Sequence, residues 1–206
     1  MIKTITINKE DGTATADIAN IVDAKTITLY VNSFTEESAK LFYIDFNKAI
    51  KSGQDIIPII IDSYGGAVDS LISMMDVIES SPVPVATICL AKAISCGSIL
   101  LSCGKNGMRY IAPSARVMIH HISSFSWDKL PEMKVSVKET ERLQELIFEK
   151  MAKNCGKKKT YFLDILKRGG NLDWYLTPRE CLKHNLVNHI KVPQFKTNIT
   201  VENTLE

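Results

Sequence analysis

The sequence predicts a single α/β domain over residues 1–206, in which strands and helices alternate along one chain. Two observations support this class. Short runs rich in β-branched residues, at 27–31 (ITLYV), 56–61 (IIPIII) and 85–90 (VATICL), are typical of buried strands. Apolar residues at helical spacing follow the first two runs, and this alternation favours helices packed on a sheet. A chain of this length can bury one sizeable core.

The first half of the chain is expected to contain two strand–helix pairs and a third strand. Ser33 and Glu36 have the spacing of a capping box, which predicts the start of the first helix. The apolar positions of this helix are Ala39, Phe42, Phe46 and Ile50. Pro58 cannot donate a hydrogen bond to a sheet, so it predicts an edge or a bulge in the second strand. After Gly65-Gly66, a second helix has its inner face at Leu71, Ile72, Met75 and Ile78.

The second half is expected to contain further helices and two short strands. A packed helix opens at 98–102, and strands at 109–111 and 116–120 flank a turn at Pro113-Ser114. The longest helix is predicted over 131–153, where Met133, Val137, Leu143, Ile147 and Met151 recur at helical spacing. Shorter helices are expected at 161–167 and 177–184, on either side of the loop GGNLD. The polar residues 194–206 are expected to form a frayed tail.

Composition and charge argue against several classes of protein. The formal net charge of +2 comes from mixed charges, with Lys157-Lys158-Lys159 as the basic run, so we expect no nucleic-acid or membrane partner. The apolar segment 85–103 carries Lys92 near its middle, which disfavours a membrane span. The N-terminus has no apolar stretch long enough for a signal peptide, which favours a cytoplasmic protein.

The cysteine pattern points to core thiols rather than disulfides or a metal site. The five cysteines are odd in number and have no CxxC spacing: Cys89, Cys96, Cys103, Cys155 and Cys181. This usage is typical of reduced thiols in a cytosol-like compartment. We expect neither a metal nor a cofactor.

Ser95 is the first candidate for chemistry, because it lies among small residues at an expected strand-to-helix turn (AKAISCGSILL). A serine nucleophile needs a base within hydrogen-bond reach, and histidine is the natural base. Among the four histidines, His120 ends a strongly apolar strand, and His121 would point to the opposite face. From the residues alone, a capping role for Ser95 and a packing role for His120 stay open as alternatives.

Three segments resemble the proteolytic subunit of the Clp protease (ClpP), a serine peptidase of family S14 in the crotonase-like superfamily. They are 61–70 (IDSYGGAVDS), 83–121 (from VPVATICLAKAISCGSILL to RVMIHH) and 172–190 (LDWYLTPRECLKHNLVNHI). Weaker similarity covers residues 17–66. The resemblance implies a ClpP-like, crotonase-like α/β fold of stacked β-α-β units with a protruding long helix.

The resemblance also implies a catalytic site. The family's nucleophile falls on Ser95, its base on His120 and its acid on Asp173, which on its own reads as a loop carboxylate. The oxyanion hole would use the backbone amides of Gly66 and Cys96, with Gly65 in a loop on the substrate side. The Cys96 thiol is a rival nucleophile only in a setting that lowers its pKa.

By the same resemblance, we expect an ATP-independent serine endopeptidase that cuts peptides or unfolded proteins inside a homo-oligomeric ring fed by an AAA+ unfoldase. Two departures weaken the expected stacking of rings: residues 121–133 (HISSFSWDKLPEM) contain no glycine, and Trp174 stands where the family has arginine. A stand-alone ClpP-like maturation peptidase is the alternative. More distant alternatives are a crotonase-type acyl-CoA enzyme and a catalytically inactive ring component.

Overall fold

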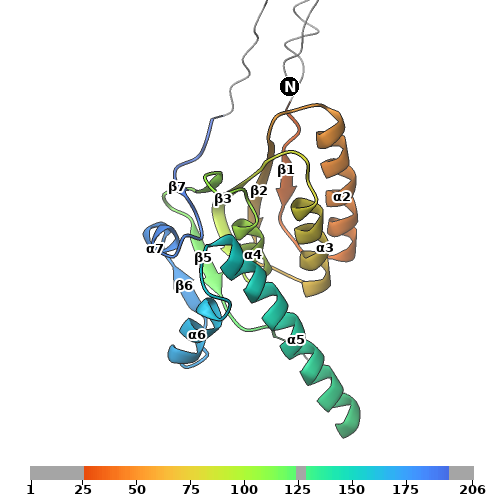
Figure 1. Cartoon of the computed structure of the whole chain (residues 1–206), viewed down its shortest axis with the longest axis vertical. Coiled ribbons are helices and arrows are strands. Elements are labelled where there is room, and N and C mark those ends of the chain that lie inside the picture. The colour runs from red at the N-terminus through yellow and green to blue at the C-terminus, as the bar shows by residue number, and fades with distance from the viewer. Residues whose placement is uncertain (1–25, 124–128, 195–206) are drawn as a thin grey trace, which may run out of the picture.

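The computed structural model describes residues 26–123 and 129–194, which form one seven-stranded sheet with helices packed on it (Figure 1). The first half contains β1 (Leu29–Val31), α2 (Glu36–Lys51), β2 (Ile57–Ser63), α3 (Val68–Glu79), β3 (Val85–Ile94) and α4 (Cys96–Ser102). The second half contains β4 (Arg109–Ile111), β5 (Arg116–Ile119), α5 (Leu130–Asn154), α6 (Tyr161–Arg168), β6 (Trp174–Leu176), α7 (Pro178–Lys183) and β7 (His189–Ile190).

The sheet is mostly parallel, and β3 is the strand on which it branches. Five strands follow the order β1-β2-β3-β4-β7, all paired in parallel. β4 pairs with the first half of β3, whereas β5 pairs with its end, from Lys92 to Ile94. β6 then adds to β5 in the antiparallel direction. The alternation of strands and crossover helices confirms the predicted α/β class.

The first helix begins later than the sequence predicts. Thr35 and Ser38 form the capping box, so the expected box of Ser33 and Glu36 is wrong. Phe34 explains the difference, because its side chain is buried and its backbone forms a bridge to Gly66. The chain must stay extended through Phe34, and Thr35 is therefore the first residue that can cap the helix.

Pro58 lies in a central strand rather than at an edge, and the bulge in β2 falls between Ile61 and Ser63. The prediction for Pro58 is therefore wrong on both points. The N–H of Ile57 donates to Pro84 on the β3 side, so the nitrogen of Pro58 faces the β1 side. The ladder with β1 starts only at Ile59. A missing donor at Pro58 costs the sheet no hydrogen bond.

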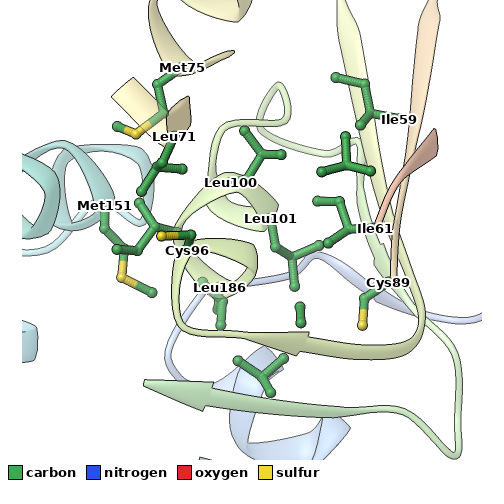
Figure 2. Packing of buried hydrophobic residues seen from close by; sticks show 14 of the residues in the cluster. Ile59, Ile61, Leu71, Met75, Cys89, Cys96, Leu100, Leu101, Met151 and Leu186 are labelled. Carbon is green, nitrogen blue, oxygen red and sulfur yellow. The ribbon is translucent and has the colours of Figure 1, made fainter. Parts of the chain in front are cut away.

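The core surrounds α4, a helix whose seven residues are all buried. Figure 2 shows Leu100 and Leu101 of α4 between Ile59 and Ile61 of β2 on one side and side chains of α3 on the other. Met151 of α5 closes the same cluster. Because α4 begins immediately after Ser95, burial of the whole helix fixes this serine relative to the sheet.

The long helix α5 packs on the domain only through its C-terminal part. Ile147, Phe148, Met151 and Ala152 are buried, whereas Met133 and Val137 have 40% and 55% of their surface exposed. Figure 1 shows the N-terminal part of α5 extending away from the sheet and the other helices. The expected protruding helix is confirmed, but the expected apolar face packs against its own chain over only part of its length.

The five cysteines are free, four of them buried and Cys103 half-buried. No helix in the described ranges is long and apolar enough to cross a membrane. Within those ranges, no cluster of three or more His, Cys, Asp or Glu side chains is arranged to hold a metal ion. The expected frayed tail lies outside the described residues, except for Gln194.

Arg109 is 1% exposed, and its guanidinium joins three parts of the fold. It donates to Ser102 O at the end of α4 (3.4 Å) and to Asn154 O at the end of α5 (2.8 Å). Its Nε donates to Asn188 Oδ1 at 3.1 Å, next to β7. Carbonyl groups at the C-terminal ends of helices lack intrahelical donors, so this cation satisfies both helices at once.

We expect Arg109→Met to lower the free energy of unfolding by about 3 kcal/mol, because the carbonyl groups of Ser102 and Asn154 at the ends of two helices would lose their donor. Urea denaturation followed by circular dichroism measures this change. Arg116→Met, at an exposed position of β5, is the matched control and should change stability by less than about 0.5 kcal/mol. Similar losses in the two variants would contradict a structural role specific to Arg109.

Candidate active site

Ser95 connects β3 to α4 in a backbone conformation that serine rarely adopts. Its φ is 57° and its ψ is −121°, and its N–H donates to Met118 O in β5 at 2.9 Å. The Ser95 side chain makes no capping hydrogen bond to α4. The capping alternative is therefore not realised in the structure. Strained positions of this kind cluster at functional sites.

Two glycines in the β2–α3 turn allow it to lie against Ser95. Gly65 has a φ of +102°, and a Cβ there would lie 2.8 Å from Ser95 Cβ. Gly66 has a φ of +150°, and a Cβ there would overlap Phe34 O. Both positions exclude other residues, through conformation and through space. The turn can therefore place its backbone beside the serine.

His120 lies directly after β5, and its Nε2 is 2.8 Å from Ser95 Oγ. The pairing of β5 with the end of β3 causes this proximity. Ile94 is opposite Met118, and the bond from Ser95 N to Met118 O continues the ladder by one step. The next side chain on the same side of β5 as Met118 is that of His120, because side chains alternate along a strand.

His121 points away from Ser95, as the alternation predicts. Its Nδ1 is 3.0 Å from Gln144 Oε1 in α5, and its Nε2 is 3.0 Å from Asn171 Oδ1. The structure therefore brings His120, and not His121, to the serine. Gln144 and Asn171 were not identifiable from the sequence as partners of His121, since they are 23 and 50 residues from it along the chain.

Asp173, the third candidate residue, lies on the other side of His120 from Ser95 and is farther from its ring. Its Oδ1 is 3.6 Å from His120 Nδ1, and its side chain is 53% exposed. This separation is that of an ion pair rather than of a hydrogen bond. The antiparallel pairing of β5 with β6 positions the carboxylate, because Trp174 lies opposite Ile119, the residue before His120.

Trp174, directly after Asp173, packs within its own chain. Its ring meets the His184 ring edge-on at 4.9 Å and lies 6.4 Å from that of Phe162. The hydroxyl of Tyr161 is 2.9 Å from His184 Nδ1, and this hydrogen bond fixes the His184 ring against which Trp174 packs. Burial lowers the pKa of His184. Trp174, expected to stand where the family has arginine, thus anchors β6, the strand that begins directly after Asp173.

The Cys96 thiol is held in a setting that disfavours its reactive form. It donates to Gly66 O at 3.2 Å, and burial raises its pKa. Nucleophilic attack needs the thiolate. The backbone N–H of Cys96, by contrast, is the first of α4 and has no acceptor within the helix.

A pocket of about 120 Å³ opens beside these groups. Its polar side includes Ser95, His120 and His121, together with Gly66 and Cys96. The other side is apolar and includes Val68, Ile99, Ile119, Ile147 and Phe148. The site therefore combines a hydroxyl bonded to an imidazole with backbone amides and space for an apolar group.

The family model for Clp protease matches residues 10–194, which is most of the chain and includes every residue of the candidate site.

We expect Cys96→Ser to retain peptidase activity within about threefold of the unchanged protein, because serine can donate the same side-chain hydrogen bond and the backbone amide is unaffected. Initial rates on a fluorogenic peptide measure this effect. Cys103→Ser, another core thiol outside the pocket lining, is the matched control. Complete inactivation of Cys96→Ser, with its fold intact, would show that the thiol takes part in the chemistry.

Proposed function

Because the chain belongs to the Clp protease family, we propose that this ClpP-like peptidase acts as a serine endopeptidase, with Ser95, His120 and Asp173 as its catalytic triad. The observation that carries the proposal is the 2.8 Å separation between Ser95 Oγ and His120 Nε2. The lack of a capping hydrogen bond from Ser95 to α4 and the nearby Asp173 carboxylate support the same roles. In this arrangement Ser95 is the nucleophile, His120 lies between it and Asp173 as the base, and Asp173 is the acid that orients His120.

The three side chains would work in sequence. His120 Nε2 takes the proton of Ser95 as Oγ attacks the peptide carbonyl carbon. The imidazolium then gives this proton to the leaving amine, and an acyl-enzyme forms on Ser95. Water, activated by His120, releases the carboxylic acid product and restores the serine. Asp173 holds the Nδ1–H tautomer and stabilises the positive charge on His120.

The negative charge on the carbonyl oxygen needs donors that are already in place. The backbone amides of Gly66 and Cys96 are the proposed oxyanion hole, because both residues line the pocket beside Ser95. Gly65, which contacts Ser95 directly, belongs to the loop on the substrate side. Neither a cofactor nor ATP takes part in this bond cleavage.

The pocket lining favours an apolar side chain on the substrate next to the cleaved bond. Its apolar side consists of aliphatic side chains and Phe148, in a space of about 120 Å³. A charged side chain would lose its hydration there, and none of the lining residues is Asp, Glu, Lys or Arg. Peptides with small to medium apolar residues at this position are therefore the proposed substrates.

Members of this family are generally oligomeric, and we propose a homo-oligomeric ring for this chain. Two exposed apolar groups are available for subunit contacts: Leu41, Tyr43 and Ile44 on α2, and Met133, Val135 and Val137 on α5. An AAA+ unfoldase would supply folded substrates to such a chamber. The alternative is a stand-alone ClpP-like maturation peptidase. A crotonase-type acyl-CoA enzyme is disfavoured, because serine and histidine occupy the positions where that chemistry would use carboxylates.

Ser95→Ala should abolish peptide hydrolysis while the fold is retained, because removal of a triad nucleophile costs on the order of 10⁶ in turnover. A fluorophosphonate probe should label Ser95 in the unchanged protein and leave the alanine variant unlabelled. Ser102→Ala, at the far end of α4, is the control that should keep its label. Persistence of more than a small fraction of activity in Ser95→Ala would exclude Ser95 as the nucleophile.

The assembly is expected to be a ring-sized oligomer with weak ring-to-ring association. Trp174, at the position of the family's contact arginine, packs on His184 of its own chain, and this reduces what it can offer to a second ring. Light scattering and electron microscopy over a range of concentrations measure the assembly. A fully active monomer would contradict the chamber, and a tight double ring would contradict weak stacking.

A further inference from the structure

His121 is held between two segments that are far from it in the sequence. Its Nδ1 is 3.0 Å from Gln144 Oε1 in α5, and its Nε2 is 3.0 Å from Asn171 Oδ1 in the turn before β6. The next residue, Ile122, donates its backbone N–H to the same Gln144 oxygen at 3.0 Å. One ring thus links the end of β5, the long helix and the turn that leads to Asp173.

The hydrogen-bond pattern allows this link in both protonation states of the ring. Ile122 N–H can bond only an acceptor, so the atom of Gln144 is an oxygen and His121 Nδ1 donates to it. In the neutral ring Nε2 is then an acceptor, and Asn171 can meet it with its NH₂ group after a half-turn of the amide. In the protonated ring, Nε2 donates to Asn171 Oδ1 instead.

Asp173 depends on the backbone that carries it, because its side chain is half exposed and reaches His120 at 3.6 Å. On its C-terminal side, Trp174 is held by pairing with Ile119 and by packing on His184. On its N-terminal side, Asn171 is two residues away and is bonded to His121. We infer that His121 is a positioning residue that, through Asn171, holds Asp173 beside His120; this inference rests on the proposed function.

The conformation of Asn171 permits a clean test of the link. Its φ is +61°, a value that glycine adopts without strain, so Asn171→Gly removes the amide and leaves the backbone free to keep its path. Asn185 has nearly the same φ, +60°, and its amide donates to Cys155 O; neither residue lines the pocket. Asn185→Gly is therefore a matched control.

The readout is the second-order rate constant for labelling of Ser95 by a fluorophosphonate in the full-length protein. His121→Ala and Asn171→Gly should each slow labelling by about three- to tenfold, the effect that one hydrogen bond supports. In an Asp173→Ala background, the same two changes should slow labelling by less than about twofold, because no carboxylate is left to position. His121→Gln, which keeps a donor and an acceptor, should recover most of the loss, and Asn185→Gly should label at the unchanged rate.

Two results would overturn the inference. Equal losses with and without Asp173 would show that His121 acts through the fold or the pocket wall, and unchanged rates in both single variants would show that the link has no effect on the site. Asn171→Gly decides the question if His121→Ala does not fold. If either result is found while the wild type is labelled at Ser95, the inference about His121 fails and the proposed function stands. A wild type that is not labelled at Ser95 would overturn both the inference and the proposed function.

Discussion

The contact between Gly65 and Ser95 is the constraint on which the rest of the site depends. Two strand-to-helix turns, β2–α3 and β3–α4, come so close that a Cβ at position 65 would lie 2.8 Å from Ser95 Cβ. This approach places Gly66 and Cys96 on the same pocket as the serine. The fully buried helix α4 and the bond from Ser95 to Met118 hold the other side of the turn.

A second property of the site is that its members come from the branch point of the sheet. β3 pairs with β4 along its first half and with β5 at its end, so β5 is brought alongside the residues that precede Ser95. β6 pairs in turn with β5 and carries the backbone next to Asp173. Pairings between strands, rather than a local motif, therefore determine the distances between Ser95, His120 and Asp173.

Local patterns predicted the elements well and the long-range contacts poorly. The apolar run before Ser95 predicted its turn, and alternation along RVMIHH separated His120 from His121 correctly. The capping box and the effect of Pro58 were mispredicted, because a bridge from Phe34 to Gly66 and the late start of the β1 ladder decide them. The short strands β6 and β7 have no pattern of their own. The Gln144–His121–Asn171 link joins residues that only the tertiary fold brings together.

The free cysteines have a consequence for how the protein can be studied. Burial raises the pKa of Cys89 and of Cys103 to about 12 and that of Cys155 to about 11, so these thiols stay protonated near neutral pH. Modification of the buried Cys89 and Cys155 by an alkylating reagent requires water and reagent to enter the core. Cys89 lies in β3 and Cys155 directly follows α5, and both elements border the site. Alkylation rates at these two positions would therefore report the free energy of local opening of the core around the site, without any added label.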